Sequence, residues 1–240
     1  MTPEKAASTL TVMEAGFKII PGKETEFLSM QAKMVPVGAS QPGFVSVYGG
    51  QILDSSWLYF GVRFESAAQM DAWFHTKQHQ AVQKMAYAKW WTAVYIRKWR
   101  SPAPGETFGN RLMCETRLTM ATALDDEQRQ SLQPFFKELS TSGARPFETL
   151  TGDFEKQPYQ FVGPLEIAPA LSGPTYSLIT HWSSAADLAL WQRSPAYLKL
   201  QTLGQVSSEI FIAMEEPGVR DHLREDRLQR QWTLEGHAAA

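Results

Sequence analysis

The pattern of hydrophobic and polar positions in the N-terminal part of the chain changes period several times. Strand-like runs occupy Leu10–Ile19, Phe44–Tyr48, Trp57–Phe64 and Trp91–Trp99, each followed by a turn or loop signal or leading into a helical pattern. Between Lys23 and Gly38, apolar residues instead recur at steps of three or four, which predicts a helix with one apolar face. The order of these elements begins as a strand, a helix and two strands.

The run Trp57–Phe64 has two unlike faces. Its even-numbered positions are all apolar, whereas its odd-numbered positions mix aromatic rings and a glycine with Arg63. A helical segment follows, for which Ser66 is the expected N-cap and Gln69 the reciprocal member of a capping box. This segment completes a βαββαβ order before the linker at 101–105.

One stretch of sequence occurs twice. Residues 64–85 and 182–203 align without gaps at a constant offset of 118 residues, the difference between 182 and 64. The identical positions are Ser66, Ala67, Ala68, Trp73 and Gln83, which recur as Ser184, Ala185, Ala186, Trp191 and Gln201. A repeat at a fixed offset predicts two copies of one domain.

The second half repeats the βαββαβ order around this stretch. Its predicted elements are a strand at Leu112–Met120, a helix from Asp125 to Leu139, and strands at Phe147–Phe154, Thr175–Trp182 and Val206–Met214. A segment rich in proline and glycine, 157–174, interrupts this order. We interpret it as a surface loop, with a lid or a dimer contact as the alternatives.

These elements predict an α+β fold made of two ferredoxin-like units. We place the first domain at residues 1–104 and the second at 107–217. The remaining residues, 218–240, are charged with apolar positions on one side, and we predict a helical tail.

Composition and charge narrow the class of protein. The chain has 240 residues, 43% of them hydrophobic, and a net charge of −2, as is typical of a soluble globular protein that binds no nucleic acid. Cys114 is the single cysteine, which suits a reducing compartment. We find no signal-peptide pattern and no apolar run of about 18 residues, so the expectation is a cytoplasmic protein with no membrane partner.

Three segments of the first half resemble the antibiotic biosynthesis monooxygenase (ABM) domain: PGKETEFL, QPGF and WLYFGVRFESAAQMDAWFHTKQHQ. In the family's short helical motif, an aromatic residue or His is followed at steps of three by Ser or Thr and then by His or an aromatic residue. The matching positions are Trp73, Thr76 and His79, and in the second copy Trp191, Ser194 and Tyr197.

The resemblance implies a dimeric α+β barrel, in which two ferredoxin-like units pair their antiparallel sheets. Since both units are in one chain, one polypeptide could form the whole barrel, and sheet closure removes exposed edges. A homodimer of the two-domain chain is a further expectation. The resemblance also implies a pocket between the sheet and the helices of each unit, and the first unit, which keeps the family signals, is where we expect the open one.

Four polar residues are the candidate catalytic groups: His75, His79, Arg63 and His181. The two histidines four residues apart are expected on one helical face, either as a general base, as half of a metal site, or as a solvated pair. Since no carboxylate or cysteine completes a metal set, we predict no metal. Arg63 could hold an anionic substrate and His181 could remove a phenolic proton, with a surface role as the alternative.

Aromatic residues are the candidate wall of a flat pocket, and the alternative is that they form the core. The predicted substrate-binding residues are Trp57, Tyr59, Trp73 and Tyr95. No G-x-G-x-x-G follows a strand, which argues against a flavin or a nicotinamide. Haem-degrading relatives carry an axial histidine where this sequence has Gln83 and Gln201, so we predict that the protein uses no cofactor.

The resemblance implies a cofactor-independent monooxygenase that oxidises an aromatic phenol or hydroquinone with O2. A base would form the phenolate, whose carbanion form reduces O2, and the peroxide would break down to a quinone. The alternative is a non-catalytic, small-molecule-binding or stress-related α+β barrel protein.

Overall fold

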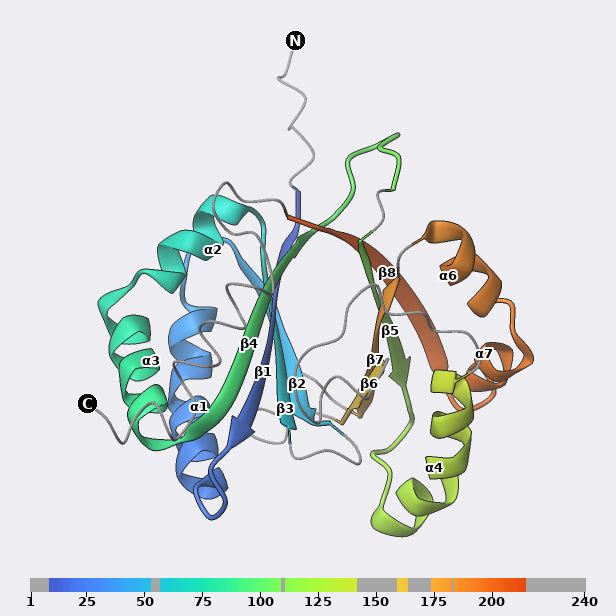
Figure 1. Cartoon of the computed structure of the whole chain (residues 1–240), viewed down its shortest axis with the longest axis horizontal. Helices are drawn as coiled ribbons and strands as arrows, with labels where there is room; N and C mark the ends of the chain where they lie inside the picture. The colour runs from blue at the N-terminus through green and yellow to red at the C-terminus, as the bar shows by residue number, and fades with distance from the viewer. Residues whose placement is uncertain are drawn as a thin grey trace. The chain divides into compact units, whose positions relative to one another are not determined.

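The computed structural model describes residues 9–52, 57–108, 111–141, 159–163, 174–182 and 184–214. It separates into two compact units, with residues 48–59 counted in the second. Two consecutive sets of elements, the first half up to residue 108 and the second half from residue 111, are considered in turn below (Figure 1).

The first half contains four strands and three helices. They are β1 (Thr11–Ile19), α1 (Glu24–Ala39), β2 (Phe44–Gln51), β3 (Trp57–Phe64), α2 (Ala67–Phe74), α3 (Lys77–Lys89) and β4 (Trp91–Arg100). The strands lie in the order β2-β3-β1-β4, and β1 pairs with β4 antiparallel. The helices cover one face of this sheet, on the left of Figure 1.

The second half has the same order of elements. They are β5 (Leu112–Thr119), α4 (Asp126–Thr141), β6 (Tyr159–Val162), β7 (Thr175–Trp182), α6 (Ala185–Trp191), α7 (Pro195–Leu200) and β8 (Gln205–Ala213). The strand order is β8-β5-β7-β6, again with antiparallel pairing in the ladders β5–β7, β5–β8 and β6–β7. The predicted α+β class with ferredoxin-like units is confirmed.

The segment 157–174 differs from the expected surface loop. Residues Tyr159–Val162 form β6, which pairs with β7 so that Tyr159 lies opposite Thr180. The proline and glycine residues around this short run hid its β-character. The strand predicted at 147–154 and the helical tail at 218–240 lie outside the described residues. The domain boundaries and the pairing of the two sheets into a barrel stay predictions.

The repeated stretch forms two short helices in each half, where the sequence suggested one helical segment. In the first half α2 ends at Phe74, and α3 begins at Lys77 with Thr76 as its N-cap. Ser66 caps α2 as predicted, since its Oγ accepts a hydrogen bond from the backbone N–H of Gln69 at 3.3 Å. Within the part of the chain that the structure describes, no helix is long and apolar enough to cross a membrane.

Candidate functional site

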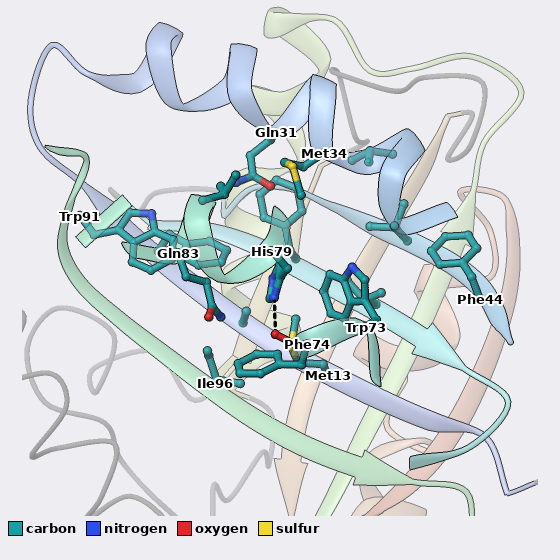
Figure 2. A pocket seen from close by; sticks show the side chains of 18 residues that line it. Met13, Gln31, Met34, Phe44, Trp73, Phe74, His79, Gln83, Trp91 and Ile96 are labelled. Carbon is teal, nitrogen blue, oxygen red and sulfur yellow. Dashed lines mark hydrogen bonds between the residues drawn. The ribbon is translucent and has the colours of Figure 1, made fainter. Parts of the chain in front are cut away.

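A cavity of about 80 Å³ lies in the first half between the sheet and its helices (Figure 2). Its floor is formed by apolar side chains of β1 and β3, and α1 and the α2–α3 pair form its walls. The polar groups among the lining residues are the imidazole of His79, the indole N–H groups of Trp73 and Trp91, and the amides of Gln31 and Gln83. Because no Asp, Glu, Lys or Arg lines the cavity, it suits an uncharged ligand.

The alternation of β3 decides which of its side chains reach this cavity. Phe60 and Val62, on the apolar face, line it. Successive strand residues point to opposite faces of a sheet, so Trp57, Tyr59 and Arg63 lie on the other face, where all three are buried. The sheet itself therefore separates these residues from the cavity.

The turn between α2 and α3 brings Trp73 and His79 together. The hydroxyl of Thr76 accepts a hydrogen bond from the N–H of His79 at 3.3 Å and donates one to the carbonyl of Trp73 at 2.9 Å. The imidazole of His79 thereby packs on the indole of Trp73, with ring centroids 4.2 Å apart and an angle of 33° between the planes. The spacing of the motif thus has a local structural cause, a helix end followed by an N-capped helix start.

The imidazole of His79 is held in one tautomer. Its Nδ1 lies 3.1 Å from the carbonyl oxygen of Phe74, and a carbonyl only accepts, so Nδ1 carries the proton (Figure 2). Burial lowers the pKa of His79 from its ordinary value, the hydrogen bond to Phe74 opposes that shift, and the neighbouring charge of His75 adds to it. His79 is therefore neutral at pH 7, with a lone pair on Nε2 that can accept a proton.

The indole N–H of Trp73 is a second polar group at the cavity. Trp73 is only 8% exposed, and its Nε1 has no hydrogen-bond acceptor among the described residues. In Figure 2 the nitrogen lies on the side of the ring that faces α1, close to Gly38. A buried donor without an acceptor is unfavourable, and an acceptor atom on a bound ligand would satisfy it.

Two of the predicted site residues, Trp73 and His79, meet at the cavity. His75 does not line it: this residue is the exposed C-cap of α2, and its Nδ1 lies 2.8 Å from the carbonyl oxygen of Asp71. The expectation that His75 and His79 share one helical face is wrong, because the two helices are separated at Thr76. His181 is buried on β7 in the second half, opposite Met113.

The sequence predicted one pocket that contains Trp57, Tyr59, Trp73 and Arg63. These residues do not come together, because Trp57, Tyr59 and Arg63 lie on the face of the sheet opposite to Trp73. Tyr95 pairs with Gly16 through its backbone, and its side chain lies outside the described residues. Sequence reasoning did not assign Gly38 and Met34 of α1 to the cavity. The apolar helical face and the apolar face of β3 were the available signals, and such faces are equally compatible with a packed core.

The cavity does not fit a haem. Gln83 lines it at the position where the ABM resemblance places a haem-ligating histidine in haem-degrading relatives, and a carboxamide is a poor substitute for an imidazole. A volume of about 80 Å³ is also much too small for the macrocycle. Among the described residues, no group of three or more His, Cys, Asp or Glu side chains could hold a metal ion.

The corresponding turn of the second half is part of a packed core. Ser194 caps α7 by accepting from the N–H of Tyr197 at 3.2 Å, and the ring of Tyr197 packs on Trp191 with centroids 4.7 Å apart. The hydroxyl of Tyr197 is hydrogen-bonded to Ser208 at 2.6 Å. Both rings belong to the buried cluster of this half, which also contains Leu112, Leu178, Trp182 and Leu200.

Residues 11–85, from β1 into α3, match the family described as antibiotic biosynthesis monooxygenase. The likeness to this family is therefore limited to the first half of the chain. The matched stretch contains Trp73, Thr76 and His79, and the match supports an ABM-type monooxygenase function in general terms. No curated protein matches the chain.

Solved structures with the same fold include two aldoxime dehydratases. One, OxdRE in complex with butyraldoxime, has a TM-score of 0.54 at 12% identity and covers 86% of this chain and 80% of its own. The other has a TM-score of 0.53 at 12% identity, with coverages of 87% and 82%. An anthrone oxidase-like protein matches over 87% of this chain and 92% of its own, at 13% identity and a TM-score of 0.36. At 12% identity the likeness to the two dehydratases is one of fold alone.

Proposed function

We propose that the first half of the chain is a monooxygenase that oxidises a small, uncharged phenol or hydroquinone with O2. The observation that carries this proposal is the geometry of His79, which lines an apolar cavity and whose Nδ1 is held by the carbonyl of Phe74, so that Nε2 is the ring nitrogen left to act as a base. A general base must lie within hydrogen-bond reach of the proton that it takes. A phenol bound in the cavity would offer its hydroxyl to Nε2.

The proposed reaction needs a base, a dry cavity and O2. His79 takes the phenolic proton, and the negative charge spreads to the ring carbon para to the oxygen. O2 adds at that carbon to form a hydroperoxide, the ring loses its para hydrogen and water leaves, which yields a para-quinone. One phenol and one O2 thus become one quinone and one water, with four electrons moving from the ring to oxygen. The imidazolium of His79 stabilises the phenolate and later returns its proton.

The size of the cavity favours a ligand with one aromatic ring over a polycyclic one. An apolar cavity of about 150 Å³ takes a benzene molecule, and this one measures about 80 Å³. The flexible side chains of Met13 and Met34 border the cavity, so that a single ring can be admitted by their movement. The lack of charged lining residues disfavours carboxylated or phosphorylated substrates.

Oxygen uptake across a panel of one-ring phenols and hydroquinones tests the proposal. We expect turnover by the wild type, and a loss of about 10²–10⁴-fold in the His79→Gln variant, as is typical for removal of a general base. His75→Gln is the matched control, because His75 is a nearby histidine that does not line the cavity. Equal activity in His79→Gln and the wild type would remove His79 from the mechanism.

The second candidate function, a small-molecule-binding barrel without catalysis, predicts a different outcome of the same experiment. Phenols would then bind to the wild type with no oxygen consumption. The proposal also includes turnover without a cofactor, which activity measurements on protein treated with a chelator would test.

It further includes the association of two chains into a homodimer, which light scattering of the pure chain would test. The panel of phenols and hydroquinones addresses the identity of the substrate.

A further inference from the structure

Gly38 occupies a helical position that does not require a glycine. It is buried in the last turn of α1, and it does not have a positive φ. A Cβ placed on it would meet Nε1 of Trp73 at 3.7 Å and Cε2 at 4.0 Å, which is ordinary van der Waals contact. Glycine destabilises a helix relative to alanine, so neither backbone conformation nor packing explains its presence here.

The space beside Gly38 lies next to a buried hydrogen-bond donor, the indole N–H of Trp73. The added Cβ would lie next to the indole nitrogen of Trp73, the one that has no acceptor among the described residues. Both residues line the cavity, so a ligand bound there lies close to this space. Two independent observations therefore concern the same place: Gly38 leaves a space unoccupied, and the adjacent indole N–H of Trp73 has no hydrogen-bond acceptor among the described residues.

We propose that Gly38 is a specificity-determining residue, which keeps open a notch for a carbonyl oxygen of the ligand beside the indole N–H of Trp73. This inference rests on the proposed function and narrows its substrate class. The ligand is a one-ring phenol that also carries a ketone or aldehyde group. Its hydroxyl faces Nε2 of His79, and its carbonyl oxygen accepts from Trp73.

Binding of two probes of similar shape tests the proposal. 3-Hydroxyacetophenone carries the carbonyl, whereas 3-ethylphenol replaces it with a methylene group. In the Gly38→Ala variant we expect the Kd of 3-hydroxyacetophenone to rise about tenfold or more, because a methyl group displaces the oxygen from the indole N–H. The Kd of 3-ethylphenol should change much less. The melting temperature should not fall, since alanine is the better helix former.

Two more variants separate this effect from a general change of the cavity. Gly38→Ser places its own acceptor near Trp73 and should weaken binding of the ketone in the same way. Val35→Ala alters another lining residue of α1 and should affect both probes alike. Equal Kd changes for both probes in Gly38→Ala would overturn the role of Gly38 while leaving phenol binding intact. Failure of the wild type to bind either probe would overturn both this inference and the proposed function.

Discussion

The turn at Trp73–His79 and the turn at Trp191–Tyr197 are built in the same way and serve different ends. Each has a tryptophan near the end of one short helix and a Ser or Thr that caps the next helix. Three residues after this cap comes a ring that packs back on the tryptophan. The ring centroids are 4.2 Å apart in the first turn and 4.7 Å in the second. The scaffold is therefore independent of whether the ring belongs to histidine or tyrosine.

The two turns differ in what surrounds the ring that packs on the tryptophan. Tyr197 is buried in the hydrophobic cluster of the second half, and its hydroxyl is hydrogen-bonded to Ser208. His79 borders a cavity, and the hydrogen bond of its Nδ1 to the carbonyl of Phe74 leaves Nε2 as the unprotonated nitrogen. A turn that stabilises one half can thus present a titratable group in the other, through the exchange of one side chain and the space left around it.

The largest expected effect is a loss of activity when the ring of the first turn, His79, is replaced by the tyrosine that the second turn carries. In a His79→Tyr variant the ring can still pack on Trp73, but the base is lost, since a phenol is protonated at neutral pH. We expect oxygen uptake with a one-ring phenol to fall about 10²–10⁴-fold. Tyr197→Phe, which removes only the hydroxyl in the second half, is the control and should keep full turnover. Comparable losses in the two variants would contradict the division of roles.

The second expected effect concerns stability. Trp191→Ala removes a side chain from a filled core and should lower the free energy of unfolding by about 3–5 kcal/mol. Trp73→Ala should be less destabilising by roughly 1–2 kcal/mol, because one side of Trp73 already faces the cavity and makes fewer contacts there. Urea unfolding of both variants measures the difference. A larger loss for Trp73 would mean that the first half is the more tightly packed.

The sequence carries enough information to predict the fold and part of the site. The repeat and the period changes predict the described strands and helices apart from β6, and the ABM motif identifies Trp73 and His79. It does not reveal the helix break at Thr76, because a threonine can stand within a helix as well as cap one. Hence His75 and His79 look like neighbours on one face, although they are not.

The sequence also does not reveal that the apolar face of β3 lines a cavity. A polar residue such as Arg63 on a mixed face is a common sign of a site, whereas the cavity lies on the wholly apolar face. Apolar residues are equally compatible with a packed core and with an apolar binding site. Whether such a face forms a core or a binding site depends on how completely the helix side chains fill the space above the sheet. That is a property of three-dimensional packing.

A smaller effect is expected from the two capping residues. Thr76→Ala and Ser194→Ala each remove a side-chain acceptor at a helix start, and each should cost about 1 kcal/mol in the free energy of unfolding. Only Thr76→Ala should also reduce turnover, because it releases the start of the helix that carries His79. Thr76→Ser keeps the hydroxyl and should restore both properties. Unchanged turnover in a folded Thr76→Ala protein would show that the cap does not position His79.

The smallest expected effect is on pH dependence. Burial lowers the pKa of His79, so its neutral form, the base, is already dominant at neutral pH. The rate should rise with pH through a midpoint below about 6.5 and be level above it. The unfolded chain binds the proton more readily, so the contribution of His79 to stability is complete above about pH 6.5 and is lost as the pH falls through the lowered pKa. A rate midpoint above about 6.5 would contradict the lowered pKa.

The most direct test of the central claim, that a phenol binds at His79 in the first half, is NMR of protein labelled with ¹⁵N-histidine. The signals of His79 are identified by their loss in the His79→Gln variant. We expect them to show a protonated Nδ1 and an unprotonated Nε2. Addition of a one-ring phenol should shift the Nε2 signal of His79 and leave those of His75 and His181 in place. Unmoved His79 signals together with a shift of His181 would contradict the account and place the binding site in the second half.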